Sequence, residues 1–324
     1  MSRIIGELGG TKKGPLIILI GGLHGNELKG IKAIERVFNK IKEDNLEISG
    51  KIIGLEGNKK AIEKKERYLD YDLNRCWTDE HIQHLTESHH IFAEDEEVLE
   101  LNSIFDKLSS YESTKKVCVD LHTTSSDNGN FIVVPEITSD DPVINALKLP
   151  LILDLEKHIK GTLLKYLTQK GYLAFAFEGG LIGSEVAVEL HTAGIWEILL
   201  SSGAVSPDHV NGIMQIGTLL QTFAAELPHK LRVRHHYWIT EEDNFRMKPG
   251  YLNFQKVKAG EVIAHDRNGP IKIPMDGMIF MPLYQRSGND GFFVVEELDP
   301  LRRINLSADP SRFDKISKQT SWKR

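Results

Sequence analysis

The sequence predicts an α/β fold in which a mixed, mostly parallel sheet carries helices on both faces, with a small C-terminal β domain. In the first two thirds of the 324 residues, short aliphatic runs bounded by glycine alternate with stretches of helical periodicity. Such alternation implies crossover connections between parallel strands. From about Glu226 onwards, short strand-like runs follow one another at Gly, Pro and Asn-Gly turns. We therefore predict two domains, residues 1–226 and 227–324.

The elements of the first domain can be assigned in order from their periodicity. Buried strands are expected at 15–22, 50–58, 115–122, 130–136 and 172–180. Helical patterns occupy 26–43, the beginning of 59–75, the acidic stretch 79–110, and 184–205. In the second domain, strands at 229–239, 260–284 and 291–298 indicate a barrel or sandwich.

Composition narrows the class of protein. Hydrophobic residues make up 40% and charged residues 27%, which is ordinary for a soluble globular chain. The net charge of −6 argues against a dominant nucleic-acid-binding role. The first residues lack the pattern of a secretory signal, and no apolar run approaches the roughly 18 residues that a membrane helix needs. Cys76 and Cys118 lie far apart and form no CxxC motif. A cytoplasmic protein without a membrane partner is expected.

The stretch "LIILIGGLHGNELKG" (16–30) ends a strand with two glycines, His24 and Glu27. One interpretation is a tight turn with polar side chains, and the other is a metal site. His122 ends the strand in "VDLHTT", and Glu178 ends the strand in "FAFEGG". Ligands of such sheets gather beyond the carboxyl ends of the strands. Three histidine or carboxylate ligands with one open position are typical of catalytic zinc, so the pattern favours a metal site.

The other histidines lack this context. His81 and His84 lie in a polar stretch and are expected to face solvent, while adjacent pairs point to opposite faces of a strand. The pairs are His89 with His90 and His235 with His236.

Four motifs together carry a family resemblance. "GGLHGNE", "RYLDYDLNR", "VDLHTT" and "FAFEGG", in that order, resemble the succinylglutamate desuccinylase/aspartoacylase family, relatives of the zinc carboxypeptidases. The resemblance covers about the first 200 residues, and the β-rich C-terminal region also resembles the family. It implies a zinc-dependent amidohydrolase, a deacylase or desuccinylase, with one zinc ion per chain. The implied substrate is a small N-acyl amino acid that carries a carboxylate.

The resemblance also implies roles for individual residues. His24, Glu27 and His122 would bind the zinc ion, and Arg67 would help to polarise the scissile carbonyl. Asn74 and Arg75 would hold the substrate carboxylate, since a guanidinium engages both oxygens at once. Glu178 would be the general base on a zinc-bound water, because burial at the sheet edge raises a carboxyl pKa.

One departure from the family pattern concerns the substrate. Aspartoacylases carry an arginine about ten residues before the general base, and this chain has Thr168 there, flanked by Lys165 and Lys170. N-acetylaspartate is therefore not the expected substrate, and the sequence does not select the acyl group, the pathway or the oligomeric state. A zinc carboxypeptidase acting on peptides is the alternative function. A non-catalytic metal- or ligand-binding protein is a further one, although neither G-K-[ST] nor G-x-G-x-x-G is present.

Overall fold

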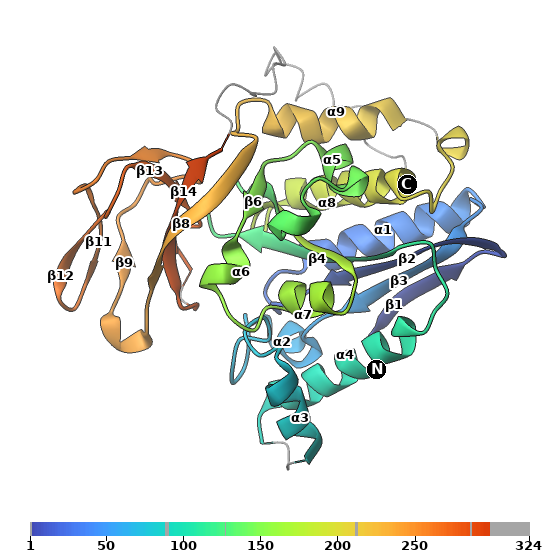
Figure 1. Cartoon of the computed structure of the whole chain (residues 1–324), viewed down its shortest axis with the longest axis horizontal. Helices are drawn as coiled ribbons and strands as arrows, with labels where there is room; N and C mark the ends of the chain where they lie inside the picture. Colours follow the sequence, from blue (N-terminus) through green and yellow to red (C-terminus); the bar gives the residue numbers. More distant parts are fainter. Residues whose placement is uncertain (1, 88–90, 127, 211–212, 286, 299–324) are drawn as a thin grey trace.

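A computed structural model describes residues 2–87, 91–126, 128–210, 213–285 and 287–298 (Figure 1). Its largest feature is an 11-stranded mixed sheet in the order β1-β3-β2-β4-β7-β5-β6-β8-β14-β13-β10. From β3 to β8 the pairs are parallel, except that β5 runs antiparallel to β7. The strands in sheet order are β1 (Ile4–Gly9), β3 (Ser49–Glu56), β2 (Lys12–Gly21), β4 (Lys116–Thr124), β7 (Leu173–Leu181), β5 (Asn130–Val133), β6 (Leu151–Leu153), β8 (Lys230–Trp238), β14 (Asp290–Glu297), β13 (Gly277–Phe280) and β10 (Lys256–Val257).

Helices cover both faces of the central strands, as predicted (Figure 1). One layer contains α1 (Lys29–Glu43), α5 (Pro142–Leu147), α8 (Glu185–Ser201) and α9 (Ile213–Ala224). The other contains α2 (Lys59–Lys64), α3 (Asp79–Glu87), α4 (Ala93–Ser109) and α7 (Leu163–Gln169). In this second layer Trp77 packs its ring against Phe105 of α4 and Tyr166 of α7. Between the layers, residues 16–20 of β2 are fully buried, which explains their continuous aliphatic sequence.

The order of the central strands brings the predicted strand ends together. Strand β4 lies between β2 and β7 and is parallel to both, so the carboxyl ends of all three strands lie at one edge. In this register His122 of β4 is directly opposite Glu178 of β7. The candidate residues from three distant motifs therefore share one end of the sheet.

The C-terminal region contains two sheets. Strands β8, β14, β13 and β10 extend the main sheet, while β12 (Gly269–Lys272), β11 (Val262–Asp266) and β9 (Arg246–Met247) form a second, antiparallel sheet. A separate apolar core takes side chains from both sheets, including Ile263 and Phe292. The predicted boundary at residues 226 and 227 falls just before β8. The division into two domains stays a prediction, and residues 299–324 lie outside the described part of the chain.

The α/β class, the helix layers and the C-terminal β region are thus confirmed. Four structural features went unpredicted: the edge strand β1, the three-residue strand β6, the short helices α5, α6 (Leu155–His158) and α7, and the helix α9. Strand β1 has no fully buried residue and no regular alternation, and β6 is too short to show any period. Within the described ranges, no helix is long and apolar enough to cross a membrane.

Candidate active site

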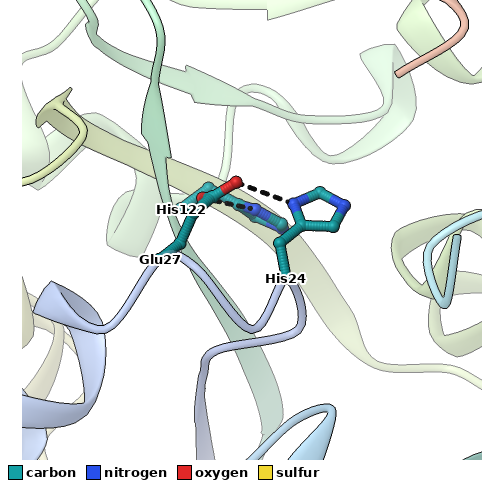
Figure 2. Close-up of side chains that lie close together, drawn as sticks. All are labelled: His24, Glu27 and His122. Carbon is teal, nitrogen blue, oxygen red and sulfur yellow. Dashed lines mark hydrogen bonds and ion pairs between the residues drawn. The ribbon is translucent and has the colours of Figure 1, made fainter. Parts of the chain in front are cut away.

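His24, Glu27 and His122 converge at the carboxyl end of the sheet (Figure 2). One Glu27 oxygen lies 2.9 Å from Nδ1 of His24, and the other lies 3.2 Å from Nδ1 of His122. One ligand atom from each residue lies within 4.8 Å of those of the other two, and all three side chains are buried. Such a group is able to hold a metal ion.

The turn after β2 depends on glycine. Gly22 has a φ of +73°, a left-handed conformation that glycine adopts without strain. A Cβ atom on Gly25 would lie 2.2 Å from the carbonyl carbon of Ala61, so only glycine fits against α2 there. The turn then brings Glu27 back toward His24, and the Glu27 amide donates to the His24 carbonyl at 3.0 Å.

Each histidine contacts a second carboxylate through its other ring nitrogen. Nε2 of His24 lies 3.1 Å from Asp72, and Nε2 of His122 lies 2.6 Å from Asp120. A carboxylate that accepts the Nε2 proton leaves the Nδ1 lone pair available, and metal-binding histidines are commonly oriented in this way. Asp72 and Asp120 therefore orient the two imidazoles toward a common point.

Glu178 supplies a further buried carboxyl group beside this cluster. It is opposite His122 in the strand register, and its Oε2 has no hydrogen-bond partner among the described residues. Burial raises the pKa of Glu178 to about 8, against a smaller lowering effect of His122. A carboxyl group with a pKa near neutrality is suited to accept and return a proton.

The electrostatics of the cluster favour a bound cation. Burial on its own would raise the pKa of Glu27, but the two imidazoles hold it well below its usual range. Conversely, burial would lower the pKa of His122, but Asp120 and Glu27 raise it well above its usual range. Glu27, Asp72 and Asp120 are all buried against the two imidazoles, so carboxylates outnumber the histidines in this cluster. Two imidazoles and a carboxylate match the donors that zinc prefers, so the residues fit the metal implied by the resemblance.

Arg67 lies against the same cluster. Its guanidinium is 3.4 Å from Glu27 and 3.2 Å from Asp72, and its Nε has no partner among the described residues. The loop that carries Arg67 is held in place by the buried carboxylate of Glu94 on α4. That carboxylate accepts hydrogen bonds from the amides of Leu69 and Asp70 at 2.7 and 3.0 Å.

Glu94→Ala should lower the free energy of unfolding by about 3 kcal/mol or more, because the two amides and the Asn58 side chain (2.9 Å) lose a buried acceptor. Glu96→Ala, on the exposed side of the same helix, removes a solvent-exposed pair with Lys60 and should cost less than about 1 kcal/mol. Urea denaturation of both variants provides the measurement. Equal decreases in the free energy of unfolding for the Glu94→Ala and Glu96→Ala variants would show that Glu94 does not hold the loop.

Asn74 and Arg75 lie farther along this loop. The Asn74 side-chain oxygen accepts from the Leu163 amide at 2.9 Å, which fixes the start of α7 beside the loop. The Arg75 guanidinium donates to the Asn74 carbonyl at 2.7 Å and pairs with Asp290 of β14. The other Asp290 oxygen lies 2.8 Å from Nε2 of His236 on β8. The C-terminal region thus reaches into the site through Asp290.

One pocket joins these groups. Its lining includes all seven residues assigned from the sequence: His24, Glu27, Arg67, Asn74, Arg75, His122 and Glu178. Thr168, Lys165 and Lys170 are not among the lining residues, and the Thr168 hydroxyl donates to the Leu164 carbonyl within α7.

Three site residues were missed from the sequence. Asp120 precedes His122 by two positions and so shares its face of the strand, a signal that was available. Asp290 and His236 come from strands far along the chain, and the sequence carried no signal that joins them to Arg75. His236 belongs to the adjacent pair His235 and His236, for which the sequence predicts no role in the site. The motif "RYLDYDLNR" contains two aspartates with different partners. Asp72 orients His24 and Arg67, whereas Asp70 accepts a hydrogen bond from the Ala93 amide.

Comparison with models of protein families shows to which family this chain is related. The model of the succinylglutamate desuccinylase/aspartoacylase catalytic domain matches residues 13–187, more than half of the chain. The chain belongs to this family. Two relatives illustrate the range of sequence identity and of matched length. A succinylglutamate desuccinylase of Pseudomonas aeruginosa is 34% identical over 74 residues, 23% of this chain and 22% of that protein. A probable aspartoacylase of Prochlorococcus marinus is 30% identical over 172 residues, 51% of each chain.

Solved structures agree on the fold of the family. A succinylglutamate desuccinylase from Chromobacterium violaceum superimposes with a TM-score of 0.61 at 18% identity, covering 90% of this chain and 87% of that one. A succinylglutamate desuccinylase/aspartoacylase from Rhodobacter sphaeroides gives 0.60 at 18% identity, covering 90% and 88%. At these identities the likeness establishes the architecture alone.

Proposed function

We propose that the protein is a zinc-dependent amidohydrolase that cleaves the amide bond of a small N-acyl amino acid carrying a carboxylate. The observation that carries the proposal is the position of Glu178, buried and directly across the strand pair from His122 of the His-Glu-His cluster. Family membership supports the same reaction class. Curated relatives are matched over only a part of their length, so the activity rests on the site.

His24, Glu27 and His122 would hold the zinc ion. Once bound there, zinc polarises a carbonyl oxygen and lowers the pKa of a water molecule toward neutrality. Asp72 and Asp120 keep the imidazoles oriented from behind. These five residues make up the proposed metal centre.

Glu178 would move the proton. As a carboxylate it accepts a proton from the attacking water, whose oxygen bonds to the carbonyl carbon. When the carbon–nitrogen bond breaks, the protonated Glu178 donates to the departing amine, which leaves the acid and the amine as products. Arg67, close to Glu27 and with Nε free of described partners, is placed to donate to the carbonyl oxygen as negative charge develops there.

Arg75 and Asn74 would position the substrate through its carboxylate. Both line the pocket, and the planar guanidinium suits a carboxylate. Arg75 is already paired with Asp290, so the substrate carboxylate would share this guanidinium. Burial raises the pKa of Asp290, but His236 and Arg75 hold it below its usual range, so Asp290 keeps its charge at neutral pH.

The proposal is tested by hydrolysis assays with the zinc-loaded protein. A panel of N-acetyl and N-succinyl amino acids is compared with short peptides of matching C-terminal residues. We expect release of free amino acid from at least one N-acyl substrate and much slower cleavage of the peptides. Faster peptide cleavage would instead favour the carboxypeptidase alternative, and no cleavage of either class would contradict the proposed reaction.

Arg75→Ala should raise KM for the carboxylate substrate by roughly 30-fold or more, because losing a charge-assisted, hydrogen-bonded pair costs about 2–5 kcal/mol. The uncharged amide analogue of the same substrate provides the control, and its KM should change far less. Steady-state kinetics on both compounds measure the difference. Equal losses would mean that Arg75 acts only through its structural pair with Asp290.

A further inference from the structure

Ala176 has an unusual position for a residue of a central strand. Strand β7 lies between β4 and β5, and the neighbours Phe175 and Phe177 are almost completely buried. Ala176 itself is only partly buried and lines the pocket. The sheet therefore has open space above this residue, on the face that carries the candidate site.

Aliphatic side chains surround this space. We define the aliphatic subsite as the pocket-lining residues Val133, Leu155, Ile159, Leu164 and Ala176. Val133 is directly opposite Ala176 in the pairing of β5 with β7. Leu155, Ile159 and Leu164 come from α6, the residue after it, and α7, and each is less than one tenth exposed. These five side chains are apolar, and the polar neighbour Thr162 uses its hydroxyl to cap α7. The Asp120 carboxylate also lines the pocket, and one of its oxygens lies 2.6 Å from Nε2 of His122.

The subsite lies close to the proposed chemistry. Ala176 precedes Glu178 by two residues, so both side chains point to the same face of β7. Two residues along a strand correspond to roughly 7 Å. On the neighbouring strand, Asp120 is opposite Ala176 and His122 is opposite Glu178. A group in the subsite would thus lie a few bonds from an amide held beside Glu178.

The charges in the pocket disfavour a second substrate carboxylate there. Among the described lining residues, the lysine and arginine side chains are Arg67 and Arg75. Arg67 contacts Glu27 and Asp72, and Arg75 pairs with Asp290. A carboxylate buried in the aliphatic subsite would therefore be desolvated without a dedicated cation, which is strongly unfavourable.

We propose that the aliphatic subsite binds an apolar aliphatic group of the substrate. The preferred N-acyl amino acid then carries one carboxylate, for Arg75, and an aliphatic chain in place of a second carboxylate. The chain belongs either to the amino acid or to the acyl group. This inference rests on the proposed function, and it specifies the substrate class.

Shape-matched substrate pairs test the preference. N-acetyl-leucine and N-acetyl-aspartate differ mainly in charge at the amino-acid side chain, and N-(4-methylpentanoyl)glycine and N-succinylglycine differ in the same way at the acyl group. In at least one pair kcat/KM should favour the aliphatic member by roughly 100-fold or more, and the pair that does so identifies the source of the chain. Equal rates or a preference for the carboxylated member in both pairs would overturn the subsite.

Substitutions in the subsite provide the second test. Ala176→Leu fills the space and should reduce kcat/KM for the preferred aliphatic substrate at least about tenfold more than for N-acetylglycine. Leu164→Ala enlarges the subsite and should shift the preference toward a chain one or two carbons longer. Leu167→Ala, a buried residue of α7 outside the pocket lining, is the matched control and should leave the preference unshifted. The same preference in all three variants would contradict the assignment.

Calorimetry with the zinc-loaded protein separates the two proposals. Leucine should bind more tightly than aspartate, or 4-methylpentanoate more tightly than succinate, according to which substrate pair carries the preference, and Ala176→Leu should weaken that binding. This result without hydrolysis of any substrate would retain the subsite and reject the amidohydrolase. Hydrolysis with tighter binding of the dicarboxylates would reject the subsite and retain the amidohydrolase. Absence of both binding and hydrolysis would reject both.

Discussion

Glu178→Gln should lower kcat roughly 10²–10⁴-fold, the usual contribution of a general acid–base group. Glutamine keeps the size and shape of the side chain but accepts no proton from water. Glu178 is not one of the three side chains that converge as metal donors, so zinc content and KM should stay near the wild-type values. Steady-state kinetics and metal analysis on the same preparation check both expectations.

The pH dependence provides a second readout of the same variant. Before metal binding, burial raises the pKa of Glu178 to about 8, so the group is largely protonated below that pH and ionises as the pH rises. A bound cation stabilises the carboxylate and lowers this pKa. The kcat/KM of the zinc-loaded enzyme should therefore rise with pH on a limb below about pH 8, and Glu178→Gln should remove or shift that limb.

A Glu178→Gln variant with near-normal kcat would contradict the general-base role. Loss of zinc from this variant would show instead that Glu178 is a ligand. Glu185, in the first turn of α8, is the matched control on the adjacent segment because it is exposed and pairs with Lys29. Glu185→Gln should leave kcat within a factor of a few.

Glu27→Ala should abolish stoichiometric zinc binding, and His24→Ala and His122→Ala should lower zinc affinity sharply. Glu27 is the member of the cluster that contacts both imidazoles, and its oxygens also accept from the Thr123 amide at 2.7 Å. Removing it deletes one donor and leaves both histidines without their shared partner. Zinc content after gel filtration, together with a competition titration against a chelator, gives the measurement.

Asp72→Asn and Asp120→Asn are the controls for this prediction. They preserve the three donors and alter only the groups behind the histidines, so zinc affinity should fall about 10–100-fold, less than for the Ala variants at the donors. If Glu27→Ala binds zinc like the wild type, Glu27 is not a ligand. If the aspartate variants lose more affinity than the donor variants, the metal centre has been assigned to the wrong residues.

The sequence predicted the parts of the fold and of the site that depend on local pattern. Strand β2 appears as an unbroken aliphatic run because it is buried on both faces. His24, His122 and Glu178 could be grouped because they end or follow strands, and the parallel pairing of β2, β4 and β7 places those ends at one edge. The roles assigned to these residues stay predictions until the experiments above are done.

Other features depend on contacts between distant segments. The pair of Arg75 with Asp290 joins a loop near the start of the chain to β14, and nothing in either local pattern indicates it. The aliphatic subsite similarly combines β5, α6, α7 and β7 around a single small side chain. Val133, Leu155 and Leu164 look like ordinary core residues in the sequence, because only the tertiary arrangement shows that they line a pocket.

The claim that the protein is a zinc amidohydrolase is tested most directly by metal content and hydrolysis measured on one preparation of the wild-type chain. We expect about one zinc ion per chain, loss of N-acyl amino acid hydrolysis when a chelator removes the metal, and recovery when zinc is returned. A chain that binds no zinc after equilibration with it, or that hydrolyses its substrate equally well after the metal is removed, would contradict the claim.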